Sequence, residues 1–180
     1  AGLATHHVAV QGWNFLANAL DAIAIAGQTI IGTALGASDR SQAREFTSRM
    51  TRWAIGVGVV LGLVVLLTHV PVADFFAPDD EVRRLTEWVL WVVAVAQPLA
   101  GYVFLLDGVL IGAGDGPYLA KAGVIVLIIY APLALAVLWL PAGAVGLLAL
   151  WVAFSFGYMG GRAVTLGLRA RGDGWMRLGA

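Results

Sequence analysis

The stretch His7–Gly36, HVAVQGWNFLANALDAIAIAGQTIIGTALG, is mostly apolar and is long enough to cross a bilayer as one helix. Polar side chains recur along it at spacings of 4, 3, 4, 3 and 7 residues. With about 100° of rotation per helical residue, they fall within an arc of about 100° on one face. These side chains are His7, Gln11, Asn14, Asn18, Asp21 and Gln28. The pattern predicts a membrane-spanning helix with one polar face, which we call the polar stripe.

Asp21 is the most informative residue of the polar stripe because it lies near the middle of the predicted span. A carboxylate at that depth costs about 2.5–3.5 kcal/mol on insertion scales, so we expect it to face a protein interior or a water-filled cavity. There it can exchange a proton or hold a cation, with Gln11, Asn14, Asn18 and Gln28 lining a polar path. The alternative is a structural carboxylate that ties two helices together.

The composition points to a membrane protein. The 180 residues are 60% hydrophobic and 12% charged, with a mean hydropathy of +0.85, whereas soluble domains carry about 25% charged residues. A formal net charge of zero argues against nucleic acid as a partner, and the lack of cysteine excludes disulfides and thiolate metal sites. The chain begins AGLATHH, without an initiator Met or a signal peptide, so we expect it to be a piece of a longer protein.

Hydropathy and helix-breaking residues predict five spans in an all-α membrane protein. Pro71 and Pro78 are expected to end the second helix, and Pro98 to kink the third and act as a hinge. Residues 170–180, with the sequence ARGDGWMRLGA, are predicted to form a polar tail. The spans are predicted at about 3–35, 42–69, 80–111, 117–140 and 144–169.

The basic residues set the expected orientation. With five spans, the linker after the first helix, the turn after the third and the C-terminal tail share one side, and they carry most of the Arg and Lys residues. The opposite side has only Arg83 and Arg84, among several acids. We therefore predict a cytoplasmic C-terminus and an outward-facing start of the chain.

A second acid and several polar residues are weaker candidates. Asp107 lies between apolar residues near the end of the third span, where it is either functional or an acid that reaches the interface. Gln97 and Tyr102 are candidates for lining a cavity near the Pro98 bend, where freed backbone carbonyls often lie. His6 and His7 are too few ligands for a metal site, so we expect no metal.

The sequence contains no motif that indicates an enzyme. It contains no GxSxG, HExxH, P-loop or dinucleotide fingerprint. His7 and Asp21 lie about 21 Å apart along a helix, too far to act as a catalytic pair. We predict a non-enzyme without a cofactor.

Two segments resemble a known transporter family. The run LATHHVAVQGWNFLANALDAIAIAGQTIIGTALGASDRSQAR resembles the eighth transmembrane helix of the multidrug and toxic compound extrusion (MATE) family, in its DinF-like branch. LLDGVLIGAGDGPYL resembles the tenth helix of the same branch, and the likeness extends over essentially the whole chain. It implies that the five spans are helices eight to twelve, most of the C-terminal six-helix lobe of a twelve-helix transporter.

The resemblance also implies a function and its residues. A MATE transporter exchanges H⁺ or Na⁺ for an organic substrate, here expected to be cationic or amphiphilic, across the bacterial inner membrane. Asp21 and Asp107 match acidic positions typical of the branch and are the expected ion-coupling residues. The expected partners are the lipid bilayer, the small organic substrate and the N-terminal lobe of the same chain.

Two other functions stay open. A lipid-carrier flippase of the same superfamily would favour a basic cavity for a pyrophosphate, and the predicted spans show no mid-span Arg or Lys, which counts against it. A non-transporting membrane scaffold would use the polar stripe for helix–helix hydrogen bonds. In that case Asp21→Asn would change assembly instead of flux.

Overall fold

The computed structural model describes residues 2–76, 79–141 and 143–178, and these are helical except for short connections. The order is α1 (Gly2–Gly36), α2 (Arg40–Phe76), α3 (Asp80–Gly112), α4 (Gly116–Ala136) with a 3₁₀ turn η1 (Val137–Trp139), α5 (Ala144–Val152), the π-helical turn η2 (Ala153–Tyr158), and α6 (Met159–Arg171). Together they form five helical spans that are long and apolar enough to cross a membrane. The predicted all-α membrane fold is confirmed.

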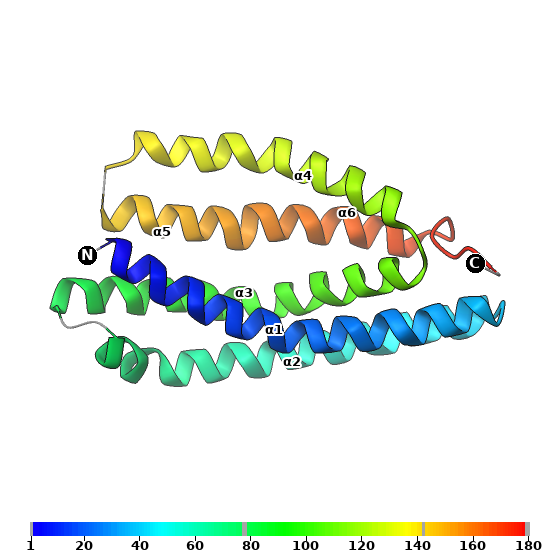
Figure 1. Ribbon diagram of the computed structural model, residues 1–180. Coiled ribbons are helices and arrows are strands. Elements are labelled where there is room, and N and C mark those ends of the chain that lie inside the picture. Colours follow the sequence, from blue (N-terminus) through cyan, green and yellow to red (C-terminus); the bar gives the residue numbers. More distant parts are fainter. Residues whose placement is uncertain (1, 77–78, 142, 179–180) are drawn as a thin grey trace.

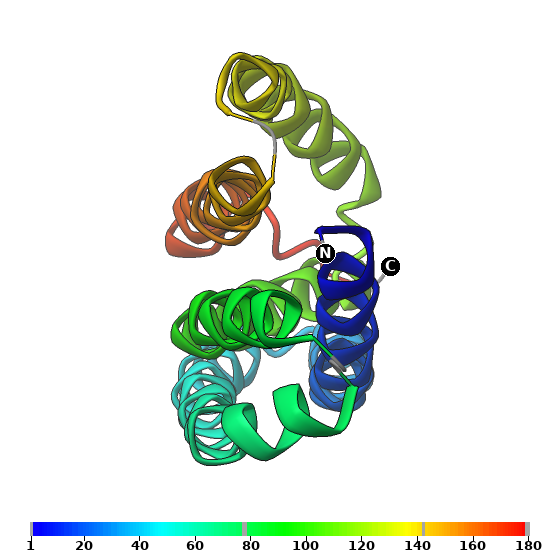
Figure 2. The same cartoon turned by 90° about the vertical axis from the view of Figure 1, so that its left-hand side faces the viewer.

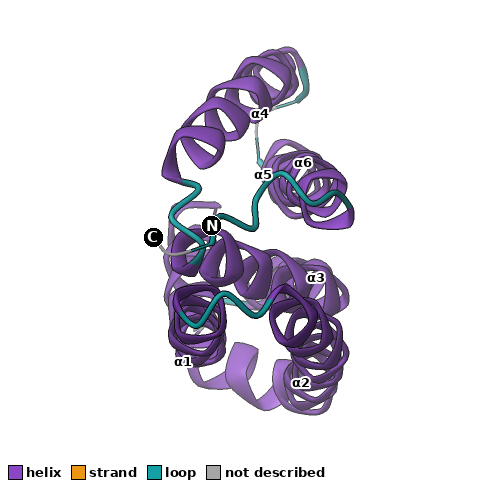
Figure 3. Ribbon diagram, turned by 90° about the vertical axis from the view of Figure 1, so that its right-hand side faces the viewer, coloured by secondary structure: helices purple, strands orange, loops and turns teal. Residues whose placement is uncertain are grey.

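The spans form two groups that meet at α3. Helices α1, α2 and α3 make a three-helix group, while α4 and the α5–η2–α6 span form a second group beside α3 (Figures 1 and 3). The core lies between the two groups and along α3, the most buried of the five spans. The flanks of α2 and α4 leave large apolar side chains exposed, as expected for a surface that faces lipid.

Small residues bring α3 into direct backbone contact with α1 and α2. A Cβ atom on Gly108 would lie 2.1 Å from the Ala24 carbonyl oxygen, and one on Gly112 would lie 2.3 Å from that of Gln28. On the other side, a Cβ on Gly62 of α2 would lie 2.5 Å from the Ala94 oxygen. Membrane helices are held by such close approach because lipid is as apolar as a leucine side chain.

The structure corrects the predicted end of the second helix. Helix α2 continues through Pro71 to Phe76 instead of ending before the proline, and Figure 2 shows its last turns running at an angle to the rest. Proline removes one backbone hydrogen bond and kinks a helix. Neighbouring groups in a helical bundle can compensate for that loss, so the chain stays helical beyond it. Pro78, the other predicted breaker, lies outside the described residues.

Pro98 also lies within a continuous helix. Since Pro98 has no N–H, the Ala94 carbonyl loses its usual helical donor. That carbonyl faces Gly62 of α2, where it lies at the close contact between the two helices.

The predicted polar tail is folded against the bundle. Trp175 is 1% exposed and Met176 is buried beside it in the core, and the Trp175 indole N–H donates to the Ala170 carbonyl. Arg44 of α2 forms an ion pair with Asp173. The tail packs because a short segment of mixed polarity can bury its two large apolar side chains while its charged groups pair at the protein surface.

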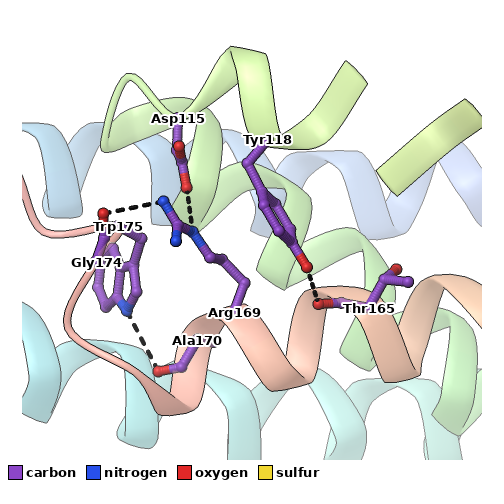
Figure 4. Close-up of polar contacts among 7 residues, drawn as sticks. All are labelled: Asp115, Tyr118, Thr165, Arg169, Ala170, Gly174 and Trp175. Atoms are coloured by element: carbon purple, nitrogen blue, oxygen red, sulfur yellow. Dashed lines mark hydrogen bonds and ion pairs between the residues drawn. The ribbon is translucent and has the colours of Figure 1, made fainter. Parts of the chain in front are cut away.

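The same end of the molecule holds a buried ion pair (Figure 4). Arg169 of α6 donates to the Asp115 carboxylate at 2.7 Å, where Asp115 is 2% exposed, and its guanidinium lies over the Tyr118 ring at 4.8 Å from the centroid. The Tyr118 hydroxyl donates to the Thr165 carbonyl at 2.6 Å. These contacts fasten the α3–α4 turn to the end of α6, so both lie at the end that also carries the α1–α2 turn.

Candidate functional site

The polar stripe lies on an open face of α1. All six of its side chains are exposed, from His7 to Gln28. The adjacent face of α1 packs against α3 through residues such as Leu20, Ala24 and Ile31. The described helices therefore leave the polar stripe uncovered instead of using it for helix–helix hydrogen bonds.

Asp21 and Asp107 open onto the same cavity. It has a volume of about 390 Å³ and lies where α1, α3, α4 and α6 meet. The two acids face each other because Gly108 of α3 packs directly on Ala24 of α1. This contact brings Asp107, the residue before Gly108, to the same level as Asp21. Gln28 of the polar stripe also lines this cavity, and the other walls are mostly apolar. We call it the two-acid cavity.

Arg162 is a site residue that the sequence interpretation missed. It lies inside the fifth span, with its side chain 13% exposed, and its guanidinium donates to the Asp107 carboxylate across the α3–α6 interface. The sequence pattern indicated no basic partner for Asp107, because Arg162 lies 55 residues away along the chain. The rule that an intramembrane acid needs a partner is the signal that would have found it.

Asn14 lies in a second cavity of about 380 Å³, nearer the start of α1. Aromatic rings dominate its walls, with Trp13 and Phe154 meeting edge to face at a centroid distance of 5.0 Å. The buried Trp151 indole N–H and the His6 Nδ1 atom have no hydrogen-bond partner among the described residues. We call this the aromatic cavity.

The turn η2 forms part of the wall of the aromatic cavity and was not predicted. Its Phe154 ring stacks on Tyr158 at 5.8 Å between centroids, and Tyr158 meets Tyr130 of α4 edge to face. Ser155 is fully buried, with no hydrogen-bond partner for its hydroxyl among the described residues. Turns of π-helix inside α-helices are often found at functional sites.

The remaining candidates lie elsewhere. Gln97 is 1% exposed at the α2–α3 contact, where its amide donates to the Val93 carbonyl. Tyr102 packs on Gly167 of α6. Gln11 and Asn18 are exposed on the polar stripe, outside the walls of both cavities. Gln97 and Tyr102 were candidates for lining a cavity near the Pro98 bend. Tyr102 lines two cavities, of about 310 and 230 Å³, between α3 and α6. Neither residue lines the two-acid cavity.

Metal ligands do not gather in the described part of the chain. No three His, Asp or Glu side chains there are placed to hold a metal ion. The two carboxylates of the two-acid cavity are suited to a proton or a single cation.

Comparison with known proteins identifies the family. The MatE family model matches residues 1–140, which is more than half of the chain and includes the polar stripe, Asp107 and all of α4. The chain belongs to the MatE family. The predicted MATE resemblance is thereby confirmed, while its placement in the DinF-like branch stays a prediction.

Curated relatives support the MatE assignment. Protein DETOXIFICATION 45, chloroplastic, from Arabidopsis thaliana is 30% identical over 163 residues, covering 91% of this chain and 28% of that protein. Protein DETOXIFICATION 42 from the same plant is 32% identical over 127 residues, covering 71% of this chain and 25% of that protein. This chain thus spans about a quarter of the length of these relatives. The search of solved structures found no match.

Proposed function

We propose that this MatE chain is part of a cation-coupled antiporter that exports organic compounds. The observation that carries the proposal is the two-acid cavity, in which Asp21 and Asp107 from two different helices face one space. The name DETOXIFICATION, which the plant relatives share, fits an export role. The coupling ion is H⁺ or Na⁺.

The chemistry of the two-acid cavity suits coupling. Carboxylate oxygens can bind a proton or a small cation. No described residue forms an ion pair with Asp21. It is therefore the acid that is free to bind and release the coupling ion.

The aromatic cavity supports an amphiphilic or cationic substrate. The faces of Trp and Tyr rings attract organic cations and bury flat apolar groups. Asn14, which is exposed on the cavity wall, adds a polar contact that can orient such a molecule. We propose that part of the substrate occupies this cavity during transport.

The proposed location is the bacterial inner membrane, with the C-terminus in the cytoplasm. The α1–α2 turn, the α3–α4 turn and the C-terminal tail lie at one end of the bundle and are joined by the Arg44–Asp173 and Arg169–Asp115 pairs. That end is rich in basic residues, which favours the cytoplasmic side.

The direct test uses the full-length protein in everted membrane vesicles that hold a proton gradient. Candidate cationic dyes are added and the collapse of the gradient is followed for wild type and for Asp21→Asn at matched expression. We expect Asp21→Asn to lower dye-driven proton release at least about tenfold, because a coupling carboxylate has been replaced by a group that does not ionise. Glu45→Gln is the control, since Glu45 lies exposed in an i,i+4 pair with Arg49.

The other outcomes separate the alternatives. Unchanged exchange by Asp21→Asn would contradict coupling through this residue. A change in assembly without a change in flux would support the scaffold function. A flippase draws some support from Arg162, but its pairing with Asp107 leaves the two-acid cavity acidic overall, which is unfavourable for a pyrophosphate.

A further inference from the structure

We propose that Arg162 limits the two-acid cavity to one bound positive charge. This inference rests on the proposed antiport function and concerns a residue that the coupling argument itself does not need. In this view Arg162 is a positioning residue and a permanent counter-charge, and it determines how many coupling charges are exchanged for each substrate molecule.

The geometry places Arg162 as a built-in part of the cavity wall. Its guanidinium donates to Asp107 from α6, and its side chain is only 13% exposed. Where it passes α4, the facing residue is Gly123, on which a Cβ atom would lie 3.9 Å from the Arg162 Nη1 atom. A larger residue at that point would compete with the guanidinium for space.

The charges around the cavity can be counted. Among the described lining residues, α1 contributes Asp21, α3 contributes Asp107 and α6 contributes Arg162, while α4 contributes the neutral Leu119. Two carboxylates and one guanidinium leave one negative charge. One bound positive charge balances that negative charge, and a second would be repelled by the guanidinium.

The identity of the basic residue makes this limit permanent. An arginine side chain stays protonated in proteins and forms a directional pair with a carboxylate. Arg162 therefore keeps its positive charge beside Asp107 and repels a second cation. One positive charge bound at Asp21 then balances the one negative charge that remains in the cavity.

The test counts displaced charges on the purified full-length transporter. Saturating tetraphenylphosphonium is added to weakly buffered protein, and the protons and ²²Na⁺ released per molecule are summed. The variants are Arg162→Gln, Arg162→Lys, and the double variant Asp107→Asn with Arg162→Gln. Arg171→Gln is the control, because Arg171 lies on α6 but does not line the two-acid cavity.

We expect Arg162→Gln to release about twice as many positive charges as wild type, since both acids can then bind one. Arg162→Lys, the double variant and Arg171→Gln should each release the wild-type number. The double variant keeps the test informative if Arg162→Gln alone folds poorly, because it removes both charges of the pair together.

The contrary results are distinct. If Arg162→Gln releases the wild-type number, or if the double variant releases more than wild type, the charge limit is overturned while antiport stands. If wild-type protein binds tetraphenylphosphonium and releases neither ion, the proposed antiport itself fails and the inference falls with it.

Discussion

At the scale of single residues, glycines set the spacing on which the two-acid cavity depends. Gly108 and Gly112 allow α3 to touch the α1 backbone near Ala24 and Gln28, residues that flank the two-acid cavity. Side chains at these glycines would push the helices apart. Asp107 would then move away from the level of Asp21.

Gly108→Ala tests this packing in the full-length protein. Its new Cβ would lie 2.1 Å from the Ala24 carbonyl oxygen, so we expect a loss of about 1–3 kcal/mol in the free energy of unfolding. The loss should appear as a lower midpoint in thermal unfolding of the detergent-solubilised protein. Gly56→Ala is the matched control: it is also inside a helix, it has open space around the new Cβ, and it should be neutral or slightly stabilising. Equal midpoints for Gly108→Ala and wild type would show that α1 and α3 pack less closely than described.

At the scale of elements, the fifth span and the C-terminal segment depart most from simple helices. The π-helical turn η2 places Phe154, Ser155 and Tyr158 where a regular helix would rotate them differently. The segment after α6 returns to the bundle and buries Trp175 among residues of α2, α3 and α6. The first departure lies on the span that carries Arg162, and the second follows directly after it.

Trp175→Ala tests whether the C-terminal segment is part of the fold. Because its side chain is 1% exposed, we expect a loss of about 3–5 kcal/mol in unfolding free energy if the whole contact is removed. Thermal unfolding and faster tryptic cleavage after Arg171 would report it. Trp139→Ala is the control, since Trp139 is 89% exposed. Wild-type stability and cleavage in Trp175→Ala would mean that the tail only rests on the surface.

At the scale of the whole molecule, α3 joins two groups of helices, and the two-acid cavity lies where they meet. The Asp115–Arg169 and Arg44–Asp173 pairs fasten the groups at the basic end. At the opposite end Arg83 forms ion pairs with Asp74 and Asp80, which ties α2 to the start of α3. The arrangement gives each end of the bundle its own set of turns and charges.

The orientation can be tested by labelling the full-length protein. These 180 residues contain no cysteine, and any cysteine outside them is first replaced by serine. Single cysteines are placed at Ser41, Glu81 and Gly172, all exposed, and intact cells are treated with a membrane-impermeant maleimide. We expect label only at position 81 in intact cells, and at positions 41 and 172 after permeabilisation. The reverse pattern would contradict the assigned orientation, and equal labelling of all three in intact cells would contradict five membrane spans.

The sequence by itself determined the five apolar spans, their alternating ends and the polar stripe of α1. These features depend on local hydropathy and on helical periodicity, which neighbouring residues encode. The same local signals misplaced the end of α2 at Pro71, since a bundle can keep a helix intact beyond a proline. They also could not show that the tail is packed.

Only the tertiary structure decided which polar groups share a site. Asp107 and Arg162 are 55 residues apart in sequence, and nothing in their local patterns records that α3 and α6 lie side by side. Asp21 and Asp107 share a cavity because the α1 and α3 backbones touch at Gly108. Gln97 lies away from both acids because it is on the face of α3 that packs against α2. Periodicity assigns a side chain to a face of its own helix, whereas the partner of that face is set by how all the helices pack.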